Sequence, residues 1–333
     1  MKAQVFKIHS DFYYVNFENK IYECKIREIL KKQQEKIIVG DFVNFDKIND
    51  STGIITEVLP RTNRLARPRV ANVSQVVIVS AVKEPDLSFE QLDRYICFAK
   101  YHGIKTKLCF NKNDLALDDT MIEQVFKIYE PLGFEIIFTS ALENINIDDF
   151  KDILRGETTV FCGNSGVGKS SLINSVFPNL NLKTKEVSEK TGRGTHTTRH
   201  CEIWEQDDIR IIDTPGFSNL KFDFILPSEL TDLFDEISEF SKGCKFSDCL
   251  HTTEIGCEVL DNLEKIAPSR YESYLSFLEE AKEFKEKVRT EGTKKESTQK
   301  DSQNKKLAKI SIQKRQTARN NAKHEAYKGL EDE

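Results

Sequence analysis

The chain has 333 residues, of which 38% are hydrophobic, and its formal net charge is −5. This length allows two or three domains with cores of their own, and no apolar run approaches the roughly 20 residues that a transmembrane helix needs. The first residues lack the apolar core of a signal peptide. We therefore expect a cytoplasmic protein without a membrane partner, in which the eight cysteines stay reduced.

Five short strand-like runs occupy residues 1–63, with few helix signals between them. They are residues 5–8, 12–17, 21–26, 37–45 and 53–58. This pattern predicts a small closed barrel, of which the OB-fold is the commonest version that binds nucleic acid. Residues 25–36 carry five Lys/Arg against two Glu, which fits a basic loop facing RNA or an ordinary solvated loop.

From Arg64 onward strands alternate with helices, which is typical of a mostly parallel sheet. Ser88 begins a capping box, and apolar residues follow it at helical spacing. Several polar loops follow or join strands, and ligands of open α/β sheets collect at the carboxyl ends of strands. These loops are residues 111–114, 139–142, 163–170, 192–198 and 213–216.

The loop at residues 163–170 reads Gly-Asn-Ser-Gly-Val-Gly-Lys-Ser, between a β-branched run and an amphipathic segment. This is the context of a phosphate-binding loop, whose backbone N–H groups and following helix dipole attract phosphate. Lys169 would reach the outer phosphates, and the Ser170 hydroxyl would bind Mg²⁺. The residues assigned to the nucleotide here are Gly163, Asn164, Ser165, Gly166, Val167, Gly168, Lys169, Ser170 and Ser171.

A second loop has the residues of a guanine reader. Asp114 can accept hydrogen bonds from the guanine N1–H and amine, whereas adenine presents an acceptor that would repel a carboxylate. Asn111 can brace neighbouring loops, and Lys112 can lay its alkyl stem across the base. Ser140 and Ala141 would support Asp114 and offer a backbone N–H to the guanine carbonyl oxygen. The whole set assigned to the base is Asn111, Lys112, Asn113, Asp114, Ser140 and Ala141.

The magnesium and γ-phosphate contacts are expected from two further loops. Asp213 would hold the Mg²⁺ shell together with Ser170, and the Gly216 N–H would sense the γ-phosphate. Thr197 or Thr198 could complete the metal shell, and we assign Thr198. Loss of the γ-phosphate would release both loops, as in other switches of this kind.

No glutamine is present to orient the attacking water. Phe217 stands where Ras-type enzymes carry that glutamine, and an apolar ring cannot replace it. His196 is the best catalytic candidate within the chain, although an exposed loop histidine without a catalytic role would look the same.

The order of the loops is rotated, because the guanine-reading elements precede the phosphate loop. Joining the old termini and cutting the chain elsewhere would produce this order without changing the sheet. The chain after Gly216 then continues into the C-terminal region. A movement of the loop at residues 213–216 that depends on the γ-phosphate can therefore be transmitted to that region directly.

Three cysteines and a histidine lie within fourteen residues of that C-terminal region. In a cytosolic protein they predict a Cys₃His zinc site, in which four ligands leave no position open for catalysis. Surface thiols or a redox pair are the alternatives. The four residues are Cys244, Cys249, His251 and Cys257.

The last part of the chain is basic. Residues 285–333 hold fourteen Lys/Arg against eight Asp/Glu, so the net charge of −5 divides into about +6 here and about −11 elsewhere. Few apolar residues follow position 290, which predicts disorder or a lone charged helix. The tail could contact phosphates or simply keep the protein soluble.

The loop order, the flanking barrel and the Cys₃His segment together resemble the RsgA (YjeQ) family of circularly permuted GTPases, over about residues 1–285. The segments that carry the likeness are residues 64–68, 71–73, 111–114, 163–172, 192–198, 213–217 and 243–257. Three positions depart from the family pattern: Asn164 stands where glutamine is usual, Ile255 where proline is common, and Arg199 where a third threonine is usual.

This resemblance implies a slow GTPase that the small ribosomal subunit stimulates and that assists the late maturation of that subunit as a GTP-dependent checkpoint. It also implies that the barrel and the zinc domain contact rRNA, and that His196 is the family's suspected catalytic residue. The alternative is an RNA-binding ribosome-assembly scaffold for which guanine nucleotide is only a regulatory ligand.

We therefore expect a multidomain monomer that uses GTP/GDP with Mg²⁺ and one structural Zn²⁺, with the small ribosomal subunit and its rRNA as partners. Its predicted parts are an OB-fold RNA-binding β-barrel (1–63), an α/β circularly permuted P-loop GTPase domain (64–222), a mostly helical zinc-binding domain (223–290) and a charged basic tail (291–333).

Overall fold

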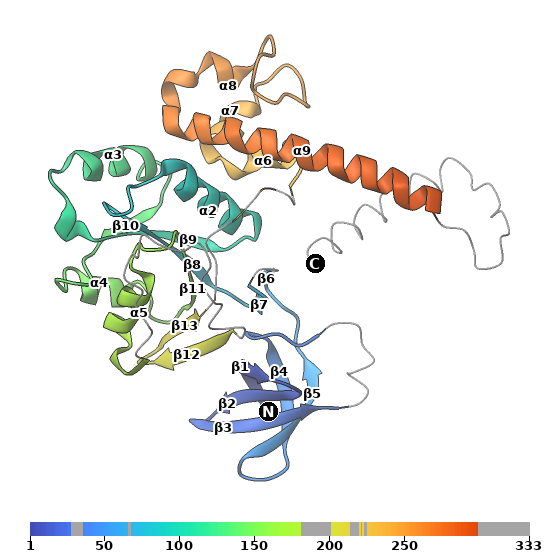
Figure 1. Cartoon of the computed structure of the whole chain (residues 1–333). Helices are drawn as coiled ribbons and strands as arrows, with labels where there is room; N and C mark the ends of the chain where they lie inside the picture. Colours follow the sequence, from blue (N-terminus) through green and yellow to red (C-terminus); the bar gives the residue numbers. More distant parts are fainter. Residues whose placement is uncertain are drawn as a thin grey trace. The chain divides into compact units, whose positions relative to one another are not determined.

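The computed structural model of the chain divides into two compact units, residues 1–220 and 221–333 (Figure 1). It describes residues 1–27, 36–65, 68–180, 201–213, 220, 222 and 225–298. Among these residues, none of the helices combines the length and the apolar character needed to span a membrane.

The N-terminal strands form the predicted barrel. They are β1 (Lys2–His9), β2 (Phe12–Phe17), β3 (Lys20–Ile26), β4 (Phe42–Lys47) and β5 (Thr52–Val58). The strand order is β1-β2-β3-β5-β4, and pairing of β4 with β1 closes the barrel. Alternate residues such as Val5, Val43 and Phe45 point inward and are fully buried, so one face of each strand builds the core.

Six further strands in the same unit continue the sheet of the barrel strands, in the order β10-β9-β8-β11-β13-β12. The strands are β8 (Gln75–Ala81), β9 (Lys105–Asn111), β10 (Glu135–Phe138), β11 (Thr158–Cys162), β12 (Glu202–Gln206) and β13 (Ile209–Asp213). Of these six described strands, β12 lies between β13 and the barrel strand β1 and runs antiparallel to β13, whereas the other five are parallel to one another. The carboxyl ends of the parallel strands therefore share one edge, where the predicted loops begin.

The helices of this unit connect the strands. They are α2 (Phe89–Tyr101), α3 (Thr120–Tyr129), α4 (Ile147–Asp152) and α5 (Lys169–Val176), with short 3₁₀ turns η1 (Asn113–Leu115) and η2 (Pro178–Leu180). The predicted cap of α2 is confirmed, because the Ser88 hydroxyl accepts the Gln91 N–H at 3.3 Å.

Barrel and sheet are joined within the first unit. Strand β1 pairs with β12, where Lys7 lies opposite Glu202 and forms an ion pair with it at 3.0 Å. The short hairpin of β6 (Arg64–Leu65) and β7 (Val70–Ala71) lies between them in sequence. Its neighbour Asn72 donates to the Gly40 carbonyl at 2.9 Å, which ties the hairpin to the barrel.

The second unit is helical. Its elements are α6 (Pro227–Leu230), η3 (Thr231–Leu233), α7 (Asp235–Ser241), α8 (Glu258–Asp261), η4 (Leu263–Lys265) and α9 (Pro268–Thr298). The core packs Phe234 against Tyr274 and Phe277 of α9. Arg270 is buried, but Glu236 pairs with its guanidinium at 2.7 Å and offsets the cost of burying that charge.

Candidate nucleotide site and metal centre

The loop between β11 and α5 wraps closely around its neighbours. Gly163 has φ +138°, and a Cβ there would lie 2.0 Å from the Val79 carbonyl oxygen. Gly168 has φ +91°, and a Cβ there would lie 2.2 Å from Asn111 Nδ2. Any larger residue at either position would displace a neighbour, so the loop follows its path only because glycine stands at both.

Lys169 begins α5 and turns back over this loop. Its Nζ donates to the carbonyl oxygens of Gly163 at 2.8 Å and Asn164 at 2.7 Å. Burial lowers the pKa of this ammonium group. Ser170 and Ser171 follow in the first turn of α5 and are partly exposed, so a cation and two hydroxyls lie at the helix N-terminus. That donor set fits the phosphates and Mg²⁺ predicted here.

Asn111 connects three of the predicted loops. It ends β9, is only 2% exposed, and donates from Nδ2 to the carbonyl oxygen of Val167 in the phosphate loop at 3.0 Å. Its Oδ1 accepts the Ala141 N–H at 3.1 Å and the Thr139 hydroxyl at 3.3 Å. The loops predicted to read guanine and the predicted phosphate loop, far apart in sequence, thus lie side by side.

The other residues predicted to read the base lie just beyond the ends of β9 and β10. Asn113 and Asp114 lie in η1, with the Asp114 side chain exposed. Lys112 has φ +61°, and its Nζ donates to the carbonyl oxygen of Glu84 in the loop after β8. Ser140 is fully buried, and its hydroxyl accepts the Glu143 N–H at 3.1 Å.

Part of the predicted site lies outside the described residues. This holds for His196, Thr198, Gly216 and Phe217. Asp213 ends β13, next to the parallel strand that leads into the phosphate loop, and the structure describes its backbone alone. The roles assigned to these residues remain predictions.

One contact in this site had no signal in the sequence. The Tyr95 hydroxyl of α2 donates to Asn164 Oδ1 in the phosphate loop at 3.2 Å. Tyr95 falls in the apolar stripe of α2, where a tyrosine is expected to serve packing alone.

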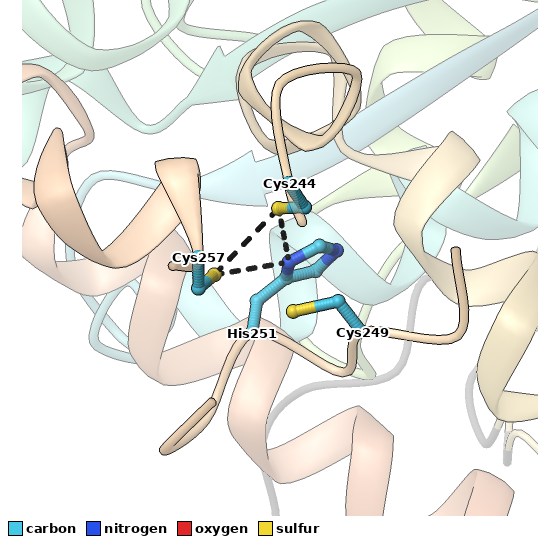
Figure 2. Close-up of side chains that lie close together, drawn as sticks. All are labelled: Cys244, Cys249, His251 and Cys257. Atoms are coloured by element: carbon cyan, nitrogen blue, oxygen red, sulfur yellow. Dashed lines mark hydrogen bonds between the residues drawn. The ribbon is translucent and has the colours of Figure 1, made fainter. Parts of the chain in front are cut away.

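The three cysteines and the histidine of the second unit converge on one point (Figure 2). Their ligand atoms all lie within 4.8 Å of one another. Cys244 Sγ is 3.8 Å from Cys257 Sγ and 3.6 Å from His251 Nδ1, which is 3.4 Å from Cys257 Sγ. A tetrahedron with metal–sulfur bonds of about 2.3 Å has edges of about 3.8 Å, so Cys244, His251 and Cys257 have the spacing that a zinc ion needs. Cys249, within 4.8 Å of the other three, is placed as the fourth ligand.

Neighbouring groups hold this cluster in place. The Glu254 carboxylate accepts backbone N–H groups of Leu250 at 2.9 Å and Thr252 at 2.8 Å. Burial raises the pKa of Glu254, but these hydrogen bonds outweigh it and lower the pKa to about 2. Burial also lowers the pKa of His251, which favours the neutral imidazole that a metal requires. The Tyr271 hydroxyl donates to the His251 carbonyl at 2.7 Å and anchors the loop on α9.

Comparison with known proteins identifies the family. A family model described as RsgA GTPase matches residues 58–223, and one described as RsgA N-terminal domain matches residues 2–55. A relative from Alkaliphilus metalliredigens, named small ribosomal subunit biogenesis GTPase RsgA, is 40% identical over 286 residues, which are 84% of this chain and 98% of the relative. The chain belongs to the RsgA GTPase family. A relative of the same name from Geobacillus sp. (strain WCH70) is 41% identical, over 85% of this chain and 98% of its own length.

Solved structures agree with the RsgA family assignment. The crystal structure of YjeQ from Thermotoga maritima has a TM-score of 0.75 and 35% identity, and the match covers 84% of this chain and 98% of that one. YloQ, described as a circularly permuted GTPase, has a TM-score of 0.73 and 34% identity, over 85% of this chain and 95% of that one. The predicted fold class, family and GTPase activity are thereby confirmed.

A third family model bears on the rotated order. The model described as 50S ribosome-binding GTPase matches residues 158–291, so the match begins at β11, directly before the phosphate loop. The loops that contain Asn111 and Ala141 precede this match in the chain. They return to the phosphate loop through the hydrogen bonds of Asn111.

Proposed function

We propose that this chain hydrolyses GTP on the small ribosomal subunit and assists the late maturation of that subunit as a GTP-dependent checkpoint. The observation that carries the proposal is the position of Asn111, whose side chain bonds both the phosphate loop and the Ala141 N–H. The name of the curated relatives, small ribosomal subunit biogenesis GTPase, supports the partner. The same proposal includes that the protein is a monomer and that it meets the small ribosomal subunit in the cytoplasm.

In this proposal each end of the nucleotide has its own recognition group. Asp114 accepts the N1–H and the amine of guanine, while Lys169 and the loop N–H groups hold the β- and γ-phosphates. Ser170, Thr198 and Asp213 would hold Mg²⁺, which would neutralise charge on the phosphate oxygens. Water attacks the γ-phosphorus, the bond to the β–γ bridging oxygen breaks, and GDP and phosphate leave.

The water needs a group to orient it, and we assign that role to His196. Phe217 cannot serve, because its ring neither donates nor accepts a hydrogen bond of the required strength. The His196→Ala variant is expected to bind GTP normally and to lose the stimulated hydrolysis. Unchanged stimulated hydrolysis in this variant would remove His196 from the mechanism.

The Cys₃His cluster would hold one structural Zn²⁺ in the second unit. The atom separations of 3.4 to 3.8 Å support this assignment over scattered surface thiols. With four protein ligands the site has no open position, so the ion would shape a surface rather than catalyse a reaction. That surface and the barrel would contact rRNA, and GTP would favour the RNA-bound conformation through a difference in affinity.

The deciding experiment measures phosphate release with and without purified small ribosomal subunits. We expect at least tenfold stimulation, which corresponds to about 1.4 kcal/mol in the activation barrier. The Lys169→Ala variant is the control and should release no phosphate above background. If subunits bind the protein but leave its rate unchanged, the scaffold alternative is correct and the nucleotide is only a regulatory ligand.

A further inference from the structure

Asn164 is held from two sides. Its backbone carbonyl oxygen accepts the Lys169 ammonium at 2.7 Å, and its side-chain Oδ1 accepts the Tyr95 hydroxyl at 3.2 Å. The first bond places the lysine, and the second ties the same residue to α2. A shift of Asn164 therefore moves one of the two carbonyl groups that locate the ammonium, the other being that of Gly163.

Tyr95 is well suited to fix that position. It lies in the middle of α2 with 2% of its surface exposed, so its ring has little freedom to move. Burial raises the pKa of its hydroxyl, which stays protonated and donates the hydrogen bond. The tyrosine belongs to a helix that packs on the sheet rather than to a loop, so it provides a rigid reference for the phosphate loop.

The flank of the loop beside this bond is incompletely filled. Tyr95, Asn164 and Val167 line a cavity of about 10 Å³ together with residues of the segment 80–91. Such a volume holds no more than one water molecule. The hydroxyl's hydrogen bond at the edge of this small cavity is a specific restraint on Asn164.

We propose that Tyr95 is a positioning residue for GTP hydrolysis, which acts through Asn164 to hold the Lys169 ammonium against the β- and γ-phosphates. The inference rests on the proposed assignment of residues 163–170 to the phosphates. Charge on these oxygens changes during the reaction, and fixed cations act most strongly where charge develops. A loosely held ammonium would still bind nucleotide by adjusting its position, but it would stabilise the transition state less well.

The Tyr95→Phe variant removes only the hydroxyl. We expect kcat for GTP hydrolysis to fall about tenfold in single-turnover assays, while KM and the Kd for GDP change less than twofold. The matched control is Tyr129→Phe, because the Tyr129 hydroxyl donates to Asp93 Oδ1 of the same helix at 2.8 Å. Each variant removes a hydroxyl that makes a hydrogen bond to or from α2, and of these two bonds the one from Tyr95 reaches the phosphate loop, so Tyr129→Phe should keep kcat.

A double variant tests the path through Asn164. Asn164→Ala removes the acceptor and should lower kcat about as much as Tyr95→Phe does. Because the two residues act through one bond, the double variant should be no slower than either single variant. An unchanged kcat in Tyr95→Phe, equal losses in Tyr95→Phe and Tyr129→Phe, or additive losses in the double variant would each overturn the proposal.

Lys169→Ala separates this inference from the proposed function. If Lys169→Ala still hydrolyses GTP at the normal rate, the assignment of the loop itself is wrong. If Lys169→Ala is inactive and Tyr95→Phe is fully active, the loop assignment holds and only the role of Tyr95 is refuted.

Discussion

The nucleotide loops and the metal cluster are built in opposite ways. The nucleotide site joins residues 56 positions apart in sequence, Asn111 and Val167, through strands of a parallel sheet. The metal cluster joins side chains within fourteen residues, between helices as short as α7 and α8. The sheet can hold the first site without its ligand, whereas the second lies in a loop that is braced by the hydrogen bonds of Glu254 and Tyr271 rather than by a sheet. Substitutions in the nucleotide loops should therefore lower the affinity for nucleotide. Substitutions of the metal-binding residues should instead unfold the second unit.

Removing the metal ligands should have the largest effect. We expect the Cys249→Ser, His251→Ala double variant to lose its zinc and the cooperative unfolding of the second unit, because structural zinc is worth about 10–16 kcal/mol in zinc-finger peptides. Metal analysis and thermal unfolding followed by circular dichroism measure both. Thr253→Ala, in the same loop, is the control and should keep one zinc per chain. A double variant with full zinc content would contradict the assignment.

A smaller effect is expected at the nucleotide site from Gly168→Ala. The new Cβ would meet Asn111 Nδ2 at 2.2 Å in a left-handed conformation, which costs about 1–3 kcal/mol and disturbs the bond from Asn111 to Val167. We expect GTP affinity to fall about tenfold or more in isothermal titration while zinc content is unchanged. Gly133→Ala is the matched control, since Gly133 has φ +81° but no atom within 4 Å of the added Cβ. Equal affinity in both variants would show that the two loops are not coupled.

The smallest effect is expected beside the metal cluster, from Glu254→Gln. The folded pKa of Glu254, about 2, is below the ordinary value of 4.5, so its carboxylate stabilises the fold above pH 4.5 and loses this effect as the pH falls toward 2. We expect the variant to unfold a few degrees lower at pH 7 in calorimetry. The difference should stay constant from pH 8 to about 5 and narrow below that range. The exposed Glu264 offers the control Glu264→Gln, and a difference that widens in acid would contradict this account.

The sequence was informative where a residue type is chemically required. Glycines in a phosphate loop and thiols around a metal are such cases, and the capping residue Ser88 is another, because few residues can replace them. Contacts between elements left no such signal. Tyr95 fits an apolar helix stripe whether or not its hydroxyl meets Asn164, and Glu254 resembles any surface carboxylate until the loop folds around it.

The joint between barrel and sheet was also beyond prediction. Strand β1 has the same alternating pattern whether its edge is free or paired with β12, so the ion pair of Lys7 and Glu202 could not be anticipated. Helix α9, by contrast, continues to Thr298, in line with the charged helix that was one of the two predictions for the segment after position 290. At the joint of barrel and sheet the partner strand, rather than the local residue pattern, decides the structure.

The nucleotide selectivity of Asp114→Asn tests most directly whether the rotated loops read a single guanine nucleotide. Xanthine carries a carbonyl where guanine carries its amine, so an asparagine at this position can donate to xanthine and no longer matches guanine. We predict that the variant loses about 10²-fold or more in affinity for GTP and gains binding and hydrolysis of xanthosine triphosphate, both of which Lys169→Ala then abolishes. Unchanged preference for GTP in Asp114→Asn would contradict a shared site for these loops.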